Sequence, residues 1–182
     1  MGRTAQISRA AILSAGLAIA DEHGLTAVTM QAVARRLRVT PMALYRHVAN
    51  KDDLLDGLVE RLLAEVSPPA AGLPWQERLA AMAHAIRATA TRHPGVFPLL
   101  LSRPAVTGEA LGARESVYAA LREAGLDPDQ VARTERLLST MILGFAASEA
   151  AGRFARHPAA VRDADFACLL EWVGHLIDAA AR

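Results

Sequence analysis

The pattern of apolar and polar positions along the first third of the chain predicts short amphipathic helices. In the first of them, apolar side chains recur at helical spacing between Ser8, a favourable N-cap residue, and Gly24, a common C-terminal stop. Thr29 and Asn50 offer similar caps to later segments, and Pro41 suits the first position of a helix. This part of the chain therefore predicts four helices, over residues 8–23, 29–37, 41–48 and 50–66.

A break follows, since the stretch SPPAAGLP combines three prolines with a glycine and is typical of a linker. Beyond it, helical periodicity returns with one interruption, the stretch HPGVFPLLLSRP at 93–104. No stretch of useful length alternates between apolar and polar residues, so strands are not expected and the fold class is all-α. The helices predicted here cover residues 75–93, 107–124, 127–157 and 163 to the C-terminus.

The helix predicted over 41–48 is unusual because it is short and carries Tyr45, Arg46 and His47 in a row. A helix of about two turns is not stable alone in water, and these side chains do not suit a core. About three residues, 38–40, separate it from the preceding helix, which is the spacing of a helix-turn-helix. In that motif the second helix enters the DNA major groove, and its polar side chains contact phosphates and base edges.

The charge distribution adds to this interpretation, although the chain of 182 residues has a net charge of only +1. Residues 1–51 hold seven basic and two acidic residues, a net charge of +5, and the remainder has a net charge of −4. A basic N-terminal module on an acidic body indicates a polyanionic partner. Lys51 and Thr29 stand at helix starts, where exposed amides attract phosphate groups.

Several other classes of protein are not supported by the sequence. The six histidines show no metal-ligand spacing, and the chain has neither a glycine-rich phosphate loop nor a nucleophile elbow. It contains no run of 18 apolar residues and no apolar leader, and its single cysteine, Cys168, is expected in a core. We therefore expect no enzyme activity, no metal, no cofactor and no membrane partner, and a cytoplasmic location.

The stretch ILSAGLAIADEHGLTAVTMQAVARRLRVTPMALYRHVANKDDLLDGLVERLL resembles the N-terminal domain of the TetR family of bacterial repressors. The resemblance covers about residues 8–63 and is strongest in ALYRHVANKDDLL. The later segment PWQERL loosely resembles the ligand domain of the tetracycline repressor subgroup. The resemblance implies a DNA-binding domain at 1–50 and a ligand-binding and dimerisation domain at 51–182, connected by the helix at 50–66.

The resemblance also implies a homodimer that binds a roughly palindromic double-stranded DNA operator. The turn and the recognition helix differ from the family pattern in two respects: Arg38 replaces the usual glycine, and the helix begins with residues that offer no side-chain donors. A left-handed Arg38 would cost about 1 kcal/mol or more, and either a phosphate contact offsets this cost or the turn differs from that of the family. The predicted DNA-binding residues come from the turn, the recognition helix and the starts of the two neighbouring helices. They are Thr29, Gln31, Arg38, Thr40, Pro41, Met42, Ala43, Tyr45, Arg46, His47 and Lys51.

The long helix predicted over 130–157 has two faces that differ in the residues they carry. One is a stripe of mostly small residues, which allows another helix to approach closely. The resemblance implies that the last two helices of each subunit pair in a dimer, and we assign the small stripe to that interface. The predicted dimer residues are Leu137, Gly144, Ala147, Ala151, Phe166, Leu170, Val173 and Ile177.

The second face of that helix is apolar with one acid, Glu149. It is expected either to fill the core or to line a cavity for an unknown small-molecule effector. A buried carboxylate needs a partner, which could be Arg87, Arg153 or a donor on the ligand. No magnesium–tetracycline site is expected, because Met82 stands where that subgroup has an asparagine. The predicted pocket residues are Met82, Ile86, Phe97, Tyr118, Leu138, Met141, Ile142, Phe145 and Glu149.

These features predict a ligand-responsive transcriptional regulator, a repressor that leaves its operator when a small apolar molecule binds the C-terminal domain. One alternative is a DNA-binding regulator that responds to a protein partner or to no ligand. A second alternative is an all-helical enzyme with a basic anion-binding N-terminus, which no catalytic constellation supports.

Overall fold

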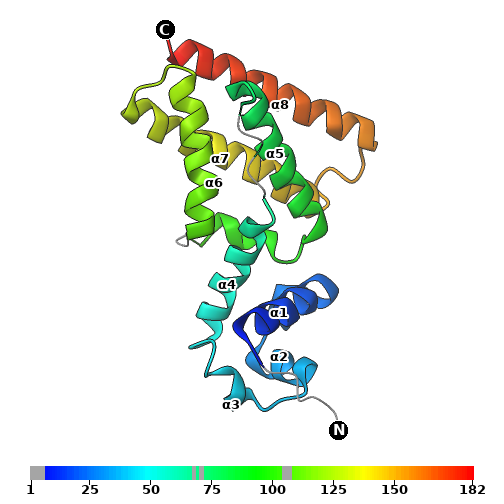
Figure 1. Ribbon diagram of the computed structural model, residues 1–182. Helices are drawn as coiled ribbons and strands as arrows, with labels where there is room; N and C mark the ends of the chain where they lie inside the picture. Colours follow the sequence, from blue (N-terminus) through cyan, green and yellow to red (C-terminus); the bar gives the residue numbers. More distant parts are fainter. Residues whose placement is uncertain (1–6, 67–68, 70–71, 104–107) are drawn as a thin grey trace. The chain divides into compact units, whose positions relative to one another are not determined.

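The computed structural model describes residues 7–66, 69, 72–103 and 108–182, and these residues contain helices and no strands (Figure 1). The predicted all-α fold class is thus confirmed. The two short 3-10 helices are η1 (Leu25–Ala27) and η2 (Phe97–Leu101). The α-helices are α1 (Arg9–His23), α2 (Met30–Leu37), α3 (Pro41–Leu44), α4 (Lys51–Ala64), α5 (Trp75–Arg92), α6 (Gly108–Glu123), α7 (Pro128–Ala150) and α8 (Ala159–Ala180).

The chain divides into two compact units, and the N-terminal unit comprises Met1–Leu62 together with His93–Ala105. Its first helices begin at the predicted caps. The Ser8 hydroxyl accepts from the backbone N–H of Ala11 at 3.2 Å, and the Thr29 hydroxyl accepts from that of Ala32 at 3.0 Å. Helix α4 packs closely on α1, since a Cβ at Gly57 would lie 2.5 Å from a methyl carbon of Leu13. The fully buried core side chains include Ile12, Val28, Val33, Leu44, Leu54 and Leu58.

Segment 93–103 joins this unit although 30 residues of the other unit precede it in the chain. The His93 ring approaches Asp21 with 2.8 Å between Nδ1 and Oδ2, and the Arg103 guanidinium forms ion pairs with Asp52 and Asp56 at 2.6 Å each. A Cβ at Gly95 would lie 2.4 Å from the backbone oxygen of Ala20, so this approach requires glycine. The units therefore divide the chain differently from the domains expected at 1–50 and 51–182.

The C-terminal unit comprises Leu63–Arg92 and Val106–Arg182, and it contains α5, α6, α7 and α8. One group of buried side chains is contributed by all four helices, and it includes Leu79, Leu121, Val131 and Ile177. A second group joins Ala83, Ile142 and Phe166. Asp127 and Gln130 form a capping box at the start of α7, as the side chain of each accepts from the backbone of the other.

Three helix boundaries differ clearly from those predicted. Helix α7 ends at Ala150 and not near 157, because Gly152 adopts φ +79° and turns the chain out of the helix. Helix α8 begins at Ala159, directly after Pro158, and not at 163. In the N-terminal unit, α3 keeps α-helical geometry only to Leu44 and continues as a turn to His47.

Within the described ranges, no helix combines the length and apolar character needed to span a bilayer. In the same ranges, no three or more His, Cys, Asp or Glu side chains are grouped in a way that could hold a metal ion.

Candidate functional site

The corner between α2 and α3 is set by one residue in a left-handed conformation. Arg38 has φ 57° and ψ 43°, and it has the only positive φ among the non-glycine residues that the structure describes. Its backbone N–H donates to the carbonyl oxygens of Ala34 and Arg35, which ends α2. Thr40 then adopts extended backbone geometry, and Pro41 opens α3. The turn that the sequence predicted therefore forms with arginine in the position that favours glycine.

The predicted DNA-facing side chains lie on the surface of this corner and of the adjacent helix starts. Met42 is the most exposed of the large apolar side chains, at 76%, and Tyr45 is exposed to 48%. Leu44 and Val48 are buried beneath them and anchor the short helix in the core. Ala43 and His47 are half-buried, and the exposed members are Thr29, Gln31, Arg38, Thr40, Pro41, Met42, Tyr45, Arg46 and Lys51.

Sequence reasoning missed Arg9, which holds the end of the recognition helix to α4 through hydrogen bonds. Its Nη1 donates to the backbone oxygen of His47 at 3.2 Å, and its Nη2 donates to Asp53 Oδ1 at 2.8 Å. The other oxygen of Asp53 accepts from the backbone N–H of Ala49 at 2.7 Å. The hydrogen bond from Arg9, followed by that from Ala49, lowers the pKa of Asp53 below its ordinary value. No short sequence pattern connects Arg9 with residues about 40 positions away.

The basic residues near the corner fall into two groups. Arg36 is held by Glu22 through two hydrogen bonds of 2.7 and 2.6 Å, which tie α2 to the end of α1. By contrast, no hydrogen bond or ion pair joins the side chains of Arg38, Arg46 or Lys51 to another described residue. These cations remain available to an external anion such as a phosphate.

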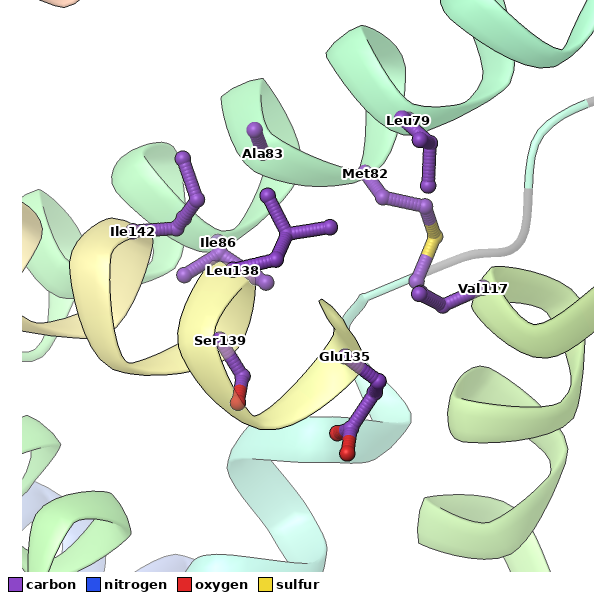
Figure 2. Close-up of a pocket in the computed structure, with 9 residues that line it drawn as sticks. All are labelled: Leu79, Met82, Ala83, Ile86, Val117, Glu135, Leu138, Ser139 and Ile142. Carbon is purple, nitrogen blue, oxygen red and sulfur yellow. The ribbon is translucent and has the colours of Figure 1, made fainter. Parts of the chain in front are cut away.

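A pocket in the C-terminal unit lies between α5, α6 and α7 (Figure 2). It has about 60 Å³ of space open to the centre of a water molecule, which is room for a few waters. Four predicted pocket residues line it: Met82, Ile86, Leu138 and Ile142. Sequence reasoning missed Leu79, Ala83, Val117, Glu135 and Ser139.

The other predicted pocket residues do not line this pocket. Phe97 is fully buried in the N-terminal unit. Tyr118 and Met141 pack against the core that α5, α6, α7 and α8 share, and Phe145 packs beside Phe166 with ring centroids 5.2 Å apart.

Glu149 faces an internal ion-pair network and not the pocket. Arg87 Nε and Nη2 donate to its two carboxylate oxygens at 2.6 and 2.7 Å, and Arg162 Nε donates to one of them at 3.1 Å. Only 13% of the Glu149 side chain is exposed. Of the three partners considered from the sequence, the structure selects Arg87, because Arg153 is exposed. The hydrogen bond from Arg87 is the main reason why the pKa of Glu149 lies below its ordinary value.

The face of α8 predicted for a dimer interface must be corrected. Phe166, Val173 and Ile177 are buried within the protomer, at exposures of 0%, 7% and 1%, so they cannot reach a partner. Leu170 is half-buried and packs beside the same core. Helix α8 is apolar on most sides, and sequence alone did not indicate which side faces inward.

The exposed apolar residues of α8 are instead Val161, Trp172 and Leu176, and the last two are each exposed to 61%. On α7, the predicted Leu137 is exposed to the same extent. Gly144 leaves open space, since a Cβ built there would meet nothing within 4 Å. Ala147 is half-buried and Ala151 is exposed.

Comparison with known proteins assigns both parts of the chain. Residues 12–58 match the family described as bacterial regulatory proteins, tetR family. Residues 68–171 match the tetracyclin repressor-like C-terminal domain. A transcriptional repressor of the helix-turn-helix type from Streptomyces coeruleorubidus, DrrR1, is 30% identical over 157 residues. That match covers 85% of this chain but only 58% of the relative, so the chain spans little more than half of that protein's length.

Solved structures of similar length give the same result. ActR from Streptomyces coelicolor, in complex with actinorhodin, superposes with a TM-score of 0.85 at 26% identity, over 97% of this chain and 99% of the other. BioQ from Mycobacterium smegmatis, solved with its double-stranded DNA operator, superposes with a TM-score of 0.80 at 26% identity, over 96% and 99% of the two chains. With both domains matched in order, the chain belongs to the TetR family, a family of transcriptional regulators and not of enzymes.

Proposed function

We propose that this protein is a cytoplasmic, ligand-responsive DNA-binding repressor that leaves a palindromic operator when a small apolar molecule binds its C-terminal unit. The observation that carries the proposal is the corner between α2 and α3. Its turn is fixed by hydrogen bonds, its polar side chains are exposed, and Arg38, Arg46 and Lys51 have no acidic partner among the described residues.

The residues of the corner suit two kinds of contact with DNA, to phosphates and to base edges. Lys51 and the exposed amides at the start of α4 suit a phosphate, as do the hydroxyl groups of Tyr45 and Thr29. Gln31 has an amide that suits adenine, and the exposed Met42 suits a thymine methyl group. The relative BioQ, solved on its operator, supports the same mode of binding for this chain.

A homodimer would place two such corners on one operator. The exposed apolar side chains of Leu137, Trp172 and Leu176, together with the open space at Gly144, support α7 and α8 as the surface that a second copy covers. Burial of a large apolar side chain contributes about 1.5–3 kcal/mol, and two-fold symmetry applies each contribution twice.

The apolar pocket between α5, α6 and α7 supports a small-molecule effector, as does the complex of ActR with actinorhodin. Because the pocket has room for only a few waters, a larger molecule must move its walls, and such a differential contact can shift a conformational equilibrium. The relative DrrR1 is a repressor, which supports the proposal that the DNA-bound protein represses transcription and that the ligand relieves the repression.

The test is binding of the purified full chain to the intergenic DNA beside its own gene, followed by fluorescence anisotropy. We expect sequence-specific binding, and the logarithm of the association constant should fall steeply and linearly with the logarithm of the salt concentration. Selection from random duplexes should return a palindrome. Binding that is weak, insensitive to salt and equal for all sequences would refute the proposal.

A further inference from the structure

The pocket between α5, α6 and α7 has a polar edge that indicates the chemistry of its ligand. Figure 2 shows Glu135 and Ser139 with their oxygens at one edge, while the apolar side chains occupy the rest of the lining. The Ser139 hydroxyl donates to the backbone oxygen of Arg136 at 3.2 Å, so its lone pairs remain as acceptors. Since Glu135 is the only charged residue lining this pocket in the part of the chain that the structure describes, the polar edge offers acceptors to a ligand.

The carboxylate of Glu135 is held by one weak partner. Arg114, on α6, donates from Nη2 to Glu135 Oε2 at 3.2 Å, and no hydrogen bond joins Oε1 to another described residue. The Glu135 side chain is 14% exposed, whereas that of Arg114 is 49% exposed. By comparison, Glu149 in the same unit is held more firmly, because Arg87 donates two hydrogen bonds to it, of 2.6 and 2.7 Å. Arg114 is therefore the more easily exchanged partner.

We propose that the pocket binds a small amphiphilic cation, an apolar body with one protonated amine, and that the ammonium group replaces Arg114 on Glu135. The apolar body would lie against Met82, Ile86 and Ile142. An anion would instead meet the Glu135 carboxylate and the lone pairs of the Ser139 hydroxyl, which disfavours it. This inference rests on the proposed function, because it takes this pocket to be the effector site.

The available volume favours a slender ligand. A second pocket, of about 50 Å³ by the same measure, lies on the other side of Leu79 and Leu138, which line both pockets. Neither reaches the roughly 150 Å³ of an engineered cavity that binds benzene. A linear alkyl chain fits such a space better than a ring.

The exchange has a structural consequence. The Arg114–Glu135 contact is the only ion pair that links α6 to α7 among the described residues. When the ammonium group takes Glu135, this link opens and Arg114 returns to water. The ligand-bound protein thus lacks one contact between α6 and α7 that the ligand-free protein has. Such a difference between two conformations is what an effector needs to shift their equilibrium.

The test uses the full chain with three probes of equal chain length: n-hexylamine, n-hexanol and hexanoate. Binding is followed by chemical-shift titration and by release from the operator. We expect hexylamine to bind about tenfold more tightly than hexanol, and hexanoate to bind most weakly. Glu135→Gln should reduce hexylamine to the level of hexanol and leave hexanol unchanged. Arg114→Gln should raise the affinity for hexylamine severalfold, because the competitor is gone.

Glu115→Gln is the control for loss of an acid, since Glu115 is an exposed acid on α6, next to Arg114, and it pairs with Arg122 and not with the pocket. It should leave all three affinities unchanged. If hexylamine binds no more tightly than hexanol, or if both pocket variants leave its affinity unchanged, the cation assignment is wrong while ligand sensing by the pocket stands. If none of the probes binds or changes operator affinity, the effector site itself is wrong.

Discussion

Replacing Arg38 with glycine should raise stability and lower DNA affinity, two effects of opposite sign from one change. Arg38 is held at φ 57° and ψ 43°, a left-handed conformation that costs an L-residue about 1–2 kcal/mol. Glycine avoids that strain but loses about 0.5–1 kcal/mol more conformational entropy on folding. The Arg38 side chain is exposed and forms no hydrogen bond or ion pair with another described residue that the change would remove, so the net gain is about 0.5–1 kcal/mol.

The stability effect can be measured by thermal unfolding at a fixed protein concentration. For a chain of this length, a gain of about 1 kcal/mol raises Tm by roughly 2–4 °C. Arg38→Asn is a useful second variant, because asparagine tolerates the left-handed region and also removes the charge. A clear fall in Tm for both variants would show that the arginine side chain stabilises the turn and would refute the strain argument.

The expected loss of DNA affinity follows because the Arg38 guanidinium has no partner among the described residues and is available to a phosphate. Each phosphate neutralised by a cation contributes about 0.9 to the slope of log affinity against log salt, so loss of one contact in each protomer lowers the slope by about 1.8. Arg133→Ala, which removes an exposed cation from α7, controls for the change in net charge. An unchanged slope for Arg38→Gly, at unchanged affinity, would remove Arg38 from the interface.

Four further changes test other parts of the molecule. Lys51→Ala should weaken binding to all sequences alike and lower the salt slope, whereas Gln31→Ala should change the preference at one base pair by about 1–3 kcal/mol; a selection from random duplexes at two salt concentrations separates them. Trp172→Glu should raise the dimer dissociation constant by a factor of roughly 10² or more, which sedimentation would detect, and an unchanged dimer would exclude this face. Glu149→Gln should cost about 1–3 kcal/mol at pH 7 in denaturant unfolding. Because the folded pKa of Glu149 lies below its unfolded value of 4.5, wild-type stability should fall as pH drops below about 4.5, and the variant should lose less over that window.

Local chemistry made much of the N-terminal unit predictable from sequence. Caps act within three residues, so the roles of Ser8 and Thr29 could be inferred, and the structure confirms their hydrogen bonds. The left-handed conformation of Arg38 was suggested only by the resemblance, whose pattern has glycine at this position, and the structure shows it at φ 57°. Arg9 could not be found, because its contacts with His47 and Asp53 depend on how α1 packs against α4.

The C-terminal unit was harder because its helices are apolar on several faces. In α8, Phe166 and Trp172 are both large and aromatic, yet one is fully buried and the other is 61% exposed. Which side faces inward depends on the rotation of the helix against α5 and α7, and periodicity does not fix that rotation. The same ambiguity on α7 led the prediction to Glu149, while Glu135 is the acid that lines the pocket.

The pairing of charges separates the structural ion pairs from the proposed DNA surface. Most arginines that contact an acid join two helices or segments of one unit, as Arg9 does with Asp53, Arg36 with Glu22, and Arg87 with Glu149. If the cations of the α2–α3 corner served only to balance charge, they would be expected to show similar pairing. Instead, both acids of the basic N-terminal stretch contact other residues, Asp21 near His93 and Glu22 on Arg36. The charges of Arg38, Arg46 and Lys51 are therefore left without an acidic partner among the described residues, which suits a surface that attracts a polyanion from a distance and loses affinity steeply as salt is added.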